Sequence, residues 1–175
     1  MEELNRLAPE EFKEKASRKM VVVLDNVRSK QNIGSIFRTC DAFGIGRIYL
    51  CGISATPPDR EIERTALGAT LSVEWEYAAS SLECVKNLKA NDYKIISIEQ
   101  THLSQFLPIP ELHDIKAAVV FGNEINGVDE EILKISDFHL EIPQQGTKHS
   151  LNVAVSAGIV LWELAGKNHQ NCEKS

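Results

Sequence analysis

Six short apolar runs, most of them nearly continuous and rich in β-branched residues, constrain the fold of this chain most strongly. They are MVVVL (20–24), RIYL (47–50), SVEWEY (72–77), YKIISI (93–98), AAVVF (117–121) and FHLEI (138–142). Runs of this kind are typical of parallel strands that helices cover on both faces. The sequence therefore predicts a buried sheet of about this many strands.

Helical patterns fill the intervals between these predicted strands. In NIGSIFRTCDAFG the apolar residues Ile33, Ile36, Phe37 and Cys40 recur at the spacing of one helix face. REIERTALGA and SSLECVKNLKAND are further candidates, and VDEEILKI contains Asp129 as a predicted N-cap. Because strands and helices alternate, we predict an α/β fold with a mainly parallel sheet and helices on both faces.

The last predicted helix, from about His149 to Gly166, differs from the others. Its sequence, SLNVAVSAGIVLWEL, is apolar nearly all round. A helix without a polar face must be buried on several sides. We therefore expect it either to lie in the middle of the fold or to present one face to a second subunit.

The chain length of 175 residues favours a single domain with a real core. We expect residues 1–19 to form an amphipathic helical extension, with Leu4, Leu7 and Phe12 on its apolar side, ahead of a domain over residues 20–175. The charged start lacks the apolar stretch of a secretory signal, and the uncharged run SLNVAVSAGIVLW is too short for a bilayer, which needs about 20 residues. We expect no association with a membrane.

Charge is unevenly distributed along the chain. The net charge of −6 argues against a protein that binds nucleic acid through its overall charge. Residues 1–70 hold 11 Lys/Arg against 10 Asp/Glu, whereas residues 71–175 hold 8 against 15. Any nucleic-acid contact is therefore predicted to use a local basic patch drawn from Arg28, Lys30, Arg38, Arg47, Arg60 and Arg64. A mixed surface without such a patch accounts for the charges equally well.

The cysteines and histidines form no ligand pattern. Cys40, Cys51, Cys84 and Cys172 make no CxxC pair, and the five histidines are scattered. The sequence therefore predicts no metal site and no disulfide, which agrees with a reducing cytoplasm.

Polar residues gather at three predicted strand-to-helix junctions. Asn32 and Arg38 follow the first strand, Glu124 lies between the glycines of VVFGNEINGVDEEI, and Ser150 and Asn152 follow the strand that ends at IPQQG. Each could be structural, as an N-cap, a turn or a solvated charge. Because a parallel sheet brings such junctions to one edge, where ligands bind, we expect them to meet. GxGxxG and GxxxxGK[ST] phosphate loops are absent.

Three ordered motifs identify a family resemblance. N-I-G-x-I-x-R-T, F-G-N-E-x-x-G and I-P-x-x-G-x-x-x-S-L-N-V closely resemble the motifs of the SpoU (TrmH-like) branch of the SPOUT methyltransferases. The resemblance covers about residues 20–165. It implies transfer of a methyl group from S-adenosyl-L-methionine (AdoMet) to a ribose 2′-hydroxyl of RNA, a homodimer and a carboxyl-terminal trefoil knot. Knots are close to forbidden on general grounds, so only the resemblance predicts one.

The resemblance also implies roles for the motif residues. Arg38 would face the target ribose and phosphate. Family proposals make this arginine the base, but arginine is effectively never deprotonated, so we assign it to positioning the phosphate and stabilising the alkoxide. Asn32 would orient the substrate or Arg38, Glu124 would hold the active-site loops in register, and Ser150 and Asn152 would contact RNA phosphate and shape the loop.

Cofactor contacts carry over in the same way. Gly122, Ile142 and Leu151 match family positions that hold AdoMet, largely through backbone groups, and Gly146 would permit close approach. The acidic second half favours a small, locally presented tRNA over rRNA. Because we expect no RNA-binding module ahead of the catalytic domain, we expect the dimer surface and residues 1–19 to hold the RNA. The alternatives are a non-catalytic RNA-binding or regulatory relative that keeps the fold and, less favoured without a phosphate loop, an unrelated nucleotide-binding α/β protein.

Overall fold

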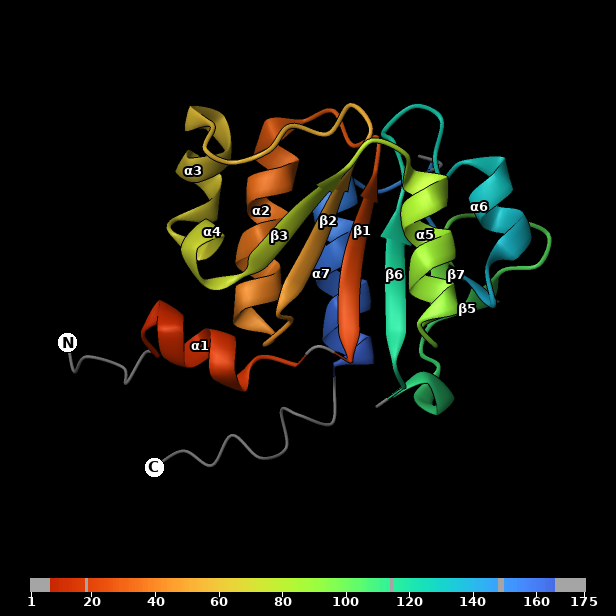
Figure 1. Ribbon diagram of the computed structural model, residues 1–175. Coiled ribbons are helices and arrows are strands. Elements are labelled where there is room, and N and C mark those ends of the chain that lie inside the picture. Colours follow the sequence, from red (N-terminus) through yellow and green to blue (C-terminus); the bar gives the residue numbers. More distant parts are fainter. Residues whose placement is uncertain (1–6, 18, 114, 148–149, 166–175) are drawn as a thin grey trace.

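A seven-stranded sheet, in which every strand pair is parallel, forms the centre of the protein (Figure 1). The computed structural model describes residues 7–17, 19–113, 115–147 and 150–165. The strand order is β3-β2-β1-β6-β4-β7-β5. The strands are β1 (Met20–Asp25), β2 (Arg47–Cys51), β3 (Glu74–Ala78), β4 (Lys94–Ile98), β5 (Gln105–Phe106), β6 (Ala117–Phe121) and β7 (Phe138–Glu141).

The six predicted strands are confirmed, with bounds that differ by at most two residues. The sequence did not reveal β5, which has two exposed residues and no apolar run. It forms at the sheet edge because β7 is already there to pair with, through Gln105 beside Leu140. Isolated short strands of this kind leave little signal in a local pattern.

Helices cover both faces of the sheet, as predicted (Figure 1). They are α1 (Pro9–Lys15), α2 (Lys30–Ala42), α3 (Arg60–Ala66), α4 (Ala69–Ser72), α5 (Ser81–Ala90), α6 (Glu130–Ile135) and α7 (Val153–Leu164), with a 3₁₀ turn at Pro110–Leu112. On β1, Val22 and Leu24 pack with α2, α3 and α7, whereas Val21 and Val23 pack with α5 and α6. This two-sided burial explains why the strand runs are continuously apolar.

The strand order determines which loops meet. β1 lies between β2 and β6, and Leu24 is in register with Phe121 at the carboxyl ends of β1 and β6. The loop after β1 and the loop after β6 therefore leave the sheet side by side, although they are about 95 residues apart in sequence. β4 and β7 continue the same edge, since β4 pairs with both β6 and β7.

The last helix begins later than predicted, and one of its sides is exposed, which fits the second of the two arrangements expected for it. α7 begins at Val153, because residues 150–152 form a loop and Asn152 caps the helix by accepting from the backbone N–H groups of Ala154 and Val155. One side, with Ala157, Val160, Leu161 and Leu164, is buried in the core. The other side exposes Val155, Ile159 and Trp162. Within one chain the helix is therefore not buried on all sides; the predicted ends at His149 and Gly166 lie outside the described residues.

The amino-terminal helix is α1, which lies beside α4 and buries Phe12 in the core, whereas Leu7, ahead of the helix, is exposed. Leu4 lies outside the described residues. None of the helices in the described ranges is long and apolar enough to span a membrane.

Candidate functional site

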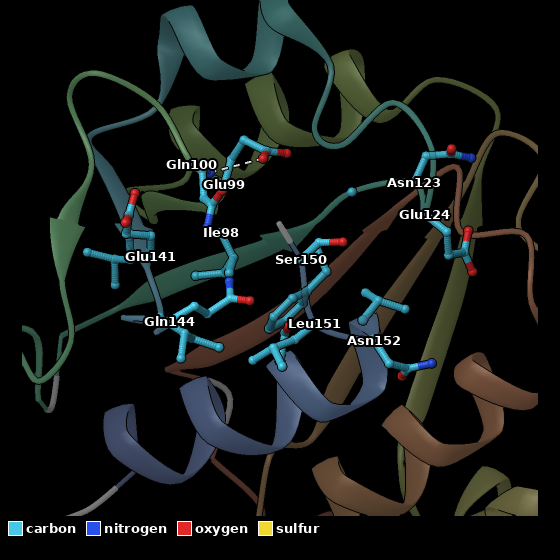
Figure 2. Close-up of a pocket in the computed structure, with 16 residues that line it drawn as sticks. Ile98, Glu99, Gln100, Asn123, Glu124, Glu141, Gln144, Ser150, Leu151 and Asn152 are labelled. Atoms are coloured by element: carbon cyan, nitrogen blue, oxygen red, sulfur yellow. Dashed lines mark hydrogen bonds between the residues drawn. The ribbon is translucent and has the colours of Figure 1, made fainter. Parts of the chain in front are cut away.

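A cavity of about 340 Å³ opens at the carboxyl ends of β4, β6 and β7. Its size falls within the range of small-molecule sites, about 300–1,000 Å³. Figure 2 shows Glu99, Gln100, Glu141 and Gln144 on one side of the cavity, Asn123, Glu124 and Asn152 on the other, and Ser150 and Leu151 between them. The lining is thus contributed by the ends of three neighbouring strands and by the segment that leads into α7.

Glu124 connects the loop after β6 to the loop after β1. Its Oε2 accepts a hydrogen bond from the backbone N–H of Arg28 at 3.0 Å, and its Oε1 accepts one from the backbone N–H of Ser29 at 3.0 Å. The side-chain Nδ2 of Asn32 donates to the same Oε1 at 3.2 Å. One carboxylate therefore accepts three hydrogen bonds from the segment that leads into α2 and from its first turn.

Asn32 and Asn152 extend this connection to the third predicted junction. Nδ2 of Asn152 donates to Oδ1 of Asn32 at 3.1 Å. Side chains of Glu124, Asn32 and Asn152 thus form one hydrogen-bonded chain across three loops. We name it the Glu124–Asn32–Asn152 junction. The expectation that these three segments meet at one sheet edge is confirmed.

The carboxylate of Glu124 is stabilised as an anion. Burial is the largest influence and raises its pKa, but the hydrogen bonds from Arg28, Ser29 and Asn32, with its own backbone N–H, together outweigh burial and hold the pKa below its ordinary value. Glu124 is therefore ionised at neutral pH and acts as an acceptor for these donors.

The glycine at position 122 has a structural reason of its own. The loop closes on itself, because the backbone N–H of Asn123 donates to the carbonyl of Gly127 at 2.9 Å and the reverse bond is also 2.9 Å. A Cβ on Gly122 would lie 2.1 Å from the carbonyl carbon of Gly127. Any side chain there would force this turn, and with it Glu124, away from its position.

The N-caps of α2 and α7 are not the motif residues Asn32 and Ser150, which could have served as caps. Ser29, not Asn32, caps α2, because its hydroxyl accepts the N–H of Asn32. Likewise Asn152, not Ser150, caps α7, and Ser150 lies in the cavity lining. Asp129 caps α6 as predicted.

The predicted cofactor residues divide into two groups. Gly122, Ile142 and Leu151 line the cavity, together with the apolar side chains of Ile98, Leu140 and Val153. Gly146 is not among the lining residues, and a Cβ built on it would meet nothing within 4 Å.

Arg38 does not line the cavity. It is exposed, in the third turn of α2, and makes no ion pair with the residues that the structure describes. Because a helix rises about 1.5 Å per residue, α2 carries Arg38 well beyond the first turn, where Asn32 joins the junction.

Glu99 and Asn123 are site residues that the sequence analysis did not assign. Oε2 of Glu99 accepts the backbone N–H of Val128 at 3.0 Å, so it holds the far end of the loop that carries Glu124. Nδ2 of Asn123 donates to the carbonyl of Asn26 at 2.7 Å, which ties the same loop to the end of β1. Both residues follow closely after predicted strands, where ligand-binding residues gather, and this position could have identified them in the sequence.

The cavity's chemistry suits a ligand with apolar and cationic parts. Glu99, Glu124 and Glu141 contribute carboxylates, and no Lys, Arg or His is among the lining residues that the structure describes. Apolar side chains from the strand ends and from Leu151 supply the remaining surface.

In the described ranges, no group of three or more His, Cys, Asp or Glu could hold a metal ion, and Cys40, Cys51 and Cys84 are free thiols.

The fold defines an α/β protein with a candidate ligand site in the cavity at the carboxyl ends of its parallel strands. The sequence profile of the SpoU rRNA Methylase family matches residues 19–162. The chain belongs to the SpoU family.

Two curated relatives illustrate the range of similarity. A tRNA (guanosine(18)-2′-O)-methyltransferase from Aquifex aeolicus is 34% identical over 156 residues, which are 87% of this chain and 72% of the relative. A TrmH family relative from Staphylococcus epidermidis is 28% identical over 93% of this chain. The chain spans 65% of the length of that relative.

Two solved structures share the fold. The A. aeolicus TrmH/SpoU tRNA modifying enzyme superposes with a TM-score of 0.82 at 27% identity, covering 93% of this chain and 83% of that one. An AdoMet-bound rRNA methyltransferase from Sinorhizobium meliloti gives a TM-score of 0.76 at 26% identity, covering 93% and 61%. The prediction of an α/β fold of the SPOUT type is thereby confirmed, whereas the knot stays a prediction.

Proposed function

We propose that this protein transfers a methyl group from AdoMet to a ribose 2′-hydroxyl of RNA. The observation that carries the proposal is the Glu124–Asn32–Asn152 junction, which joins three SpoU motifs at the rim of a cavity of suitable size. The A. aeolicus relative acts on a ribose 2′-hydroxyl of tRNA. tRNA is favoured over rRNA as the substrate because an acidic chain suits a small, locally presented RNA.

AdoMet would occupy the cavity. Gly122, Ile142 and Leu151 would contact it, and Gly146 would act from the neighbouring loop. The carboxylates of the lining fit a ligand with a sulfonium and an ammonium group, and the apolar strand ends fit an adenine ring. When bound, the cofactor supplies a methyl group that is already activated, so the protein must orient the hydroxyl and exclude water.

The catalytic roles follow from what each side chain can do. Glu124, anionic and held by three donors, keeps the loops in register. Asn32 and Asn152 present amides at the rim, and Ser150 offers a hydroxyl to RNA phosphate. Arg38 would engage the phosphate beside the target ribose and stabilise the developing alkoxide, since its guanidinium remains protonated.

The proposed assembly is a homodimer that packs through α7. Val155, Ile159 and Trp162 are 51%, 41% and 55% exposed and recur at helical spacing, which leaves an apolar stripe on one side of the helix. Val155→Asp should convert the dimer to a monomer in sedimentation, whereas Val153→Ala should not. Residues 1–19 would serve as an extension of the domain over 20–175. We expect a cytoplasmic protein, because its proposed substrate is tRNA.

The experiment that tests the function uses tritiated AdoMet with bulk tRNA and with rRNA. Incorporation that makes one site resistant to alkaline cleavage would establish ribose methylation and the RNA class. AdoMet binding by calorimetry without incorporation into either pool would support the non-catalytic relative instead, and absence of AdoMet binding would overturn the proposal.

A further inference from the structure

α3 is packed closely against the start of α2. The hydroxyl of Thr65 donates to the carbonyl of Gln31 at 3.1 Å. A Cβ on Gly34 would lie 2.1 Å from Oγ1 of Thr65 and 2.3 Å from the carbonyl oxygen of Ile62. Gly34 is thus the contact point of the two helices. The close packing places α3 beside the same turn of α2 that carries Asn32.

A charged depression lies where these helices meet. Its lining consists of Lys30, Asp59, Arg60, Glu61 and Arg64. Lys30 is already engaged, because its Nζ pairs with Asp59 at 2.8 Å, and Asp59 also caps α3. The lining therefore holds three cations and two carboxylates, and one of those carboxylates is neutralised.

After this pairing the lining still holds one carboxylate, Glu61, and two arginines, Arg60 and Arg64. Both are exposed, and neither makes an ion pair with any residue in the described ranges. Since they are four residues apart on a helix, their side chains point to the same side, about one turn or 5.4 Å apart. Exposed arginine pairs without carboxylate partners are free to bind an external anion.

Arg28 lies two residues before Lys30, which lines this depression, and its backbone is part of the candidate site. Its backbone N–H donates to Glu124 at 3.0 Å, and its exposed side chain starts from the loop directly before α2. Arg47, by contrast, is paired with Glu74 at 2.6 Å and lies at the amino ends of β2 and β3, at the opposite edge of the sheet from the junction. Six basic residues were considered for a basic patch. Of these, Arg28, Arg60 and Arg64 thus lie near the junction, and their side chains make no ion pair with a described residue.

We propose that Arg28, Arg60 and Arg64 form a surface that binds the phosphates of the RNA strand flanking the target nucleotide. The proposal rests on the proposed function. Guanidinium groups bind phosphate in a bidentate manner, and phosphate contacts position a nucleic acid without reading its sequence. On a chain with a net charge of −6, a local surface of this kind supplies the electrostatic attraction that the whole molecule lacks.

The test measures binding of bulk tRNA by the full chain over a series of salt concentrations. In the R60A/R64A variant, affinity should fall roughly 10-fold or more, and the slope of log Kd against log salt should decrease by about 1.4–1.8, because two phosphate contacts are lost. R60K/R64K should retain most of the slope, and R28A should produce a further, smaller loss. K86A/K94A removes the same charge from α5 and from the amino end of β4, and should leave both quantities unchanged.

AdoMet binding by calorimetry separates the possible failures. It should be unchanged in R60A/R64A, which also shows that the variant is folded. If the wild type binds and methylates tRNA and R60A/R64A behaves like K86A/K94A, the surface is overturned while the proposed function stands, and an acidic protein becomes the better partner. If the wild type binds neither tRNA nor AdoMet, both proposals fail together.

Discussion

The first and third turns of α2 carry two side chains on which the proposed chemistry depends, and they differ in how firmly the fold holds them. Asn32, in the first turn, is bonded on one side to Glu124 and on the other to Asn152. Arg38, in the third turn, is exposed and has no ion pair in the described residues. The loops that shape the site are therefore held before any ligand arrives, whereas the group proposed to meet the RNA is free to adjust to it.

Replacing Arg38 tests the side chain that the fold does not hold, and it should have the largest effect on methyl transfer. Arg38→Ala should lower methyl transfer by about 10²–10³-fold, the range for losing a group that stabilises developing charge. Its effect on the free energy of unfolding in urea should stay within about 0.5 kcal/mol, because the side chain is exposed and makes no ion pair with the described residues. Arg38→Lys keeps the charge without the planar fork and should recover only part of the rate. A rate within threefold of wild type for Arg38→Ala would remove this residue from the chemistry.

Replacing Glu124 tests the hydrogen-bonded junction that includes Asn32. Glu124→Ala leaves the N–H groups of Arg28 and Ser29 and the amide of Asn32 without their acceptor, so the loops should shift and methyl transfer should fall by about 10²-fold. Unlike Arg38→Ala, it should also destabilise the fold, by about 1–2 kcal/mol in urea unfolding. Glu124→Gln, which keeps one acceptor oxygen, is the matched control. Equal stability of Glu124→Ala and the wild type would show that the junction is not a structural support.

Gly34→Ala tests how α3 anchors the same helix. Its added methyl group would meet Thr65 and the carbonyl of Ile62, so we expect a loss of about 1–3 kcal/mol in the free energy of unfolding from overpacking. Gly158→Ala on α7, where a Cβ meets nothing within 4 Å in the same chain, is the matched glycine. Because Gly158 lies on the proposed dimer side of α7, both variants are compared in the Val155→Asp background, where Gly158→Ala should be neutral or slightly stabilising. Similar stability changes in the two variants would contradict the close packing of α2 and α3.

The smallest expected effect is a difference in pH dependence between wild type and Glu124→Gln. The folded-state pKa of Glu124 is lowered, so its contribution to stability is present above the unfolded-state pKa and is lost as the pH falls through the folded-state value. The wild-type advantage in urea unfolding should therefore be constant near neutral pH and shrink below about pH 4.5. An advantage that grows on acidification would mean that Glu124 is protonated in its hydrogen-bonded state.

The strands were predictable because their signal is local. Val21 to Leu24 form a short, β-branched run that is apolar on both faces, as a covered strand requires, and Asp129 carries its own capping signal. β5 was not predictable, since a neighbouring strand induces it. The outcome for the site residues follows the same division. Asn32, Glu124 and Asn152 were identified through their motifs, whereas the roles of Glu99 and Asn123 were not assigned, because each side chain bonds a backbone group of a distant segment.

The sequence by itself determined the α/β class, the two-sided burial of the central strands and the presence of three polar strand-to-helix junctions, because hydrophobic period and capping residues are properties of neighbouring positions. Only the tertiary structure decided that Glu124 accepts from Arg28 and Ser29, that α7 keeps one apolar side exposed, and that Arg38 lies away from the cavity. These depend on β1 pairing with β6 and on the path of α2 away from the sheet edge. Strand order and helix direction bring together groups almost a hundred residues apart, and no local pattern specifies which groups those are.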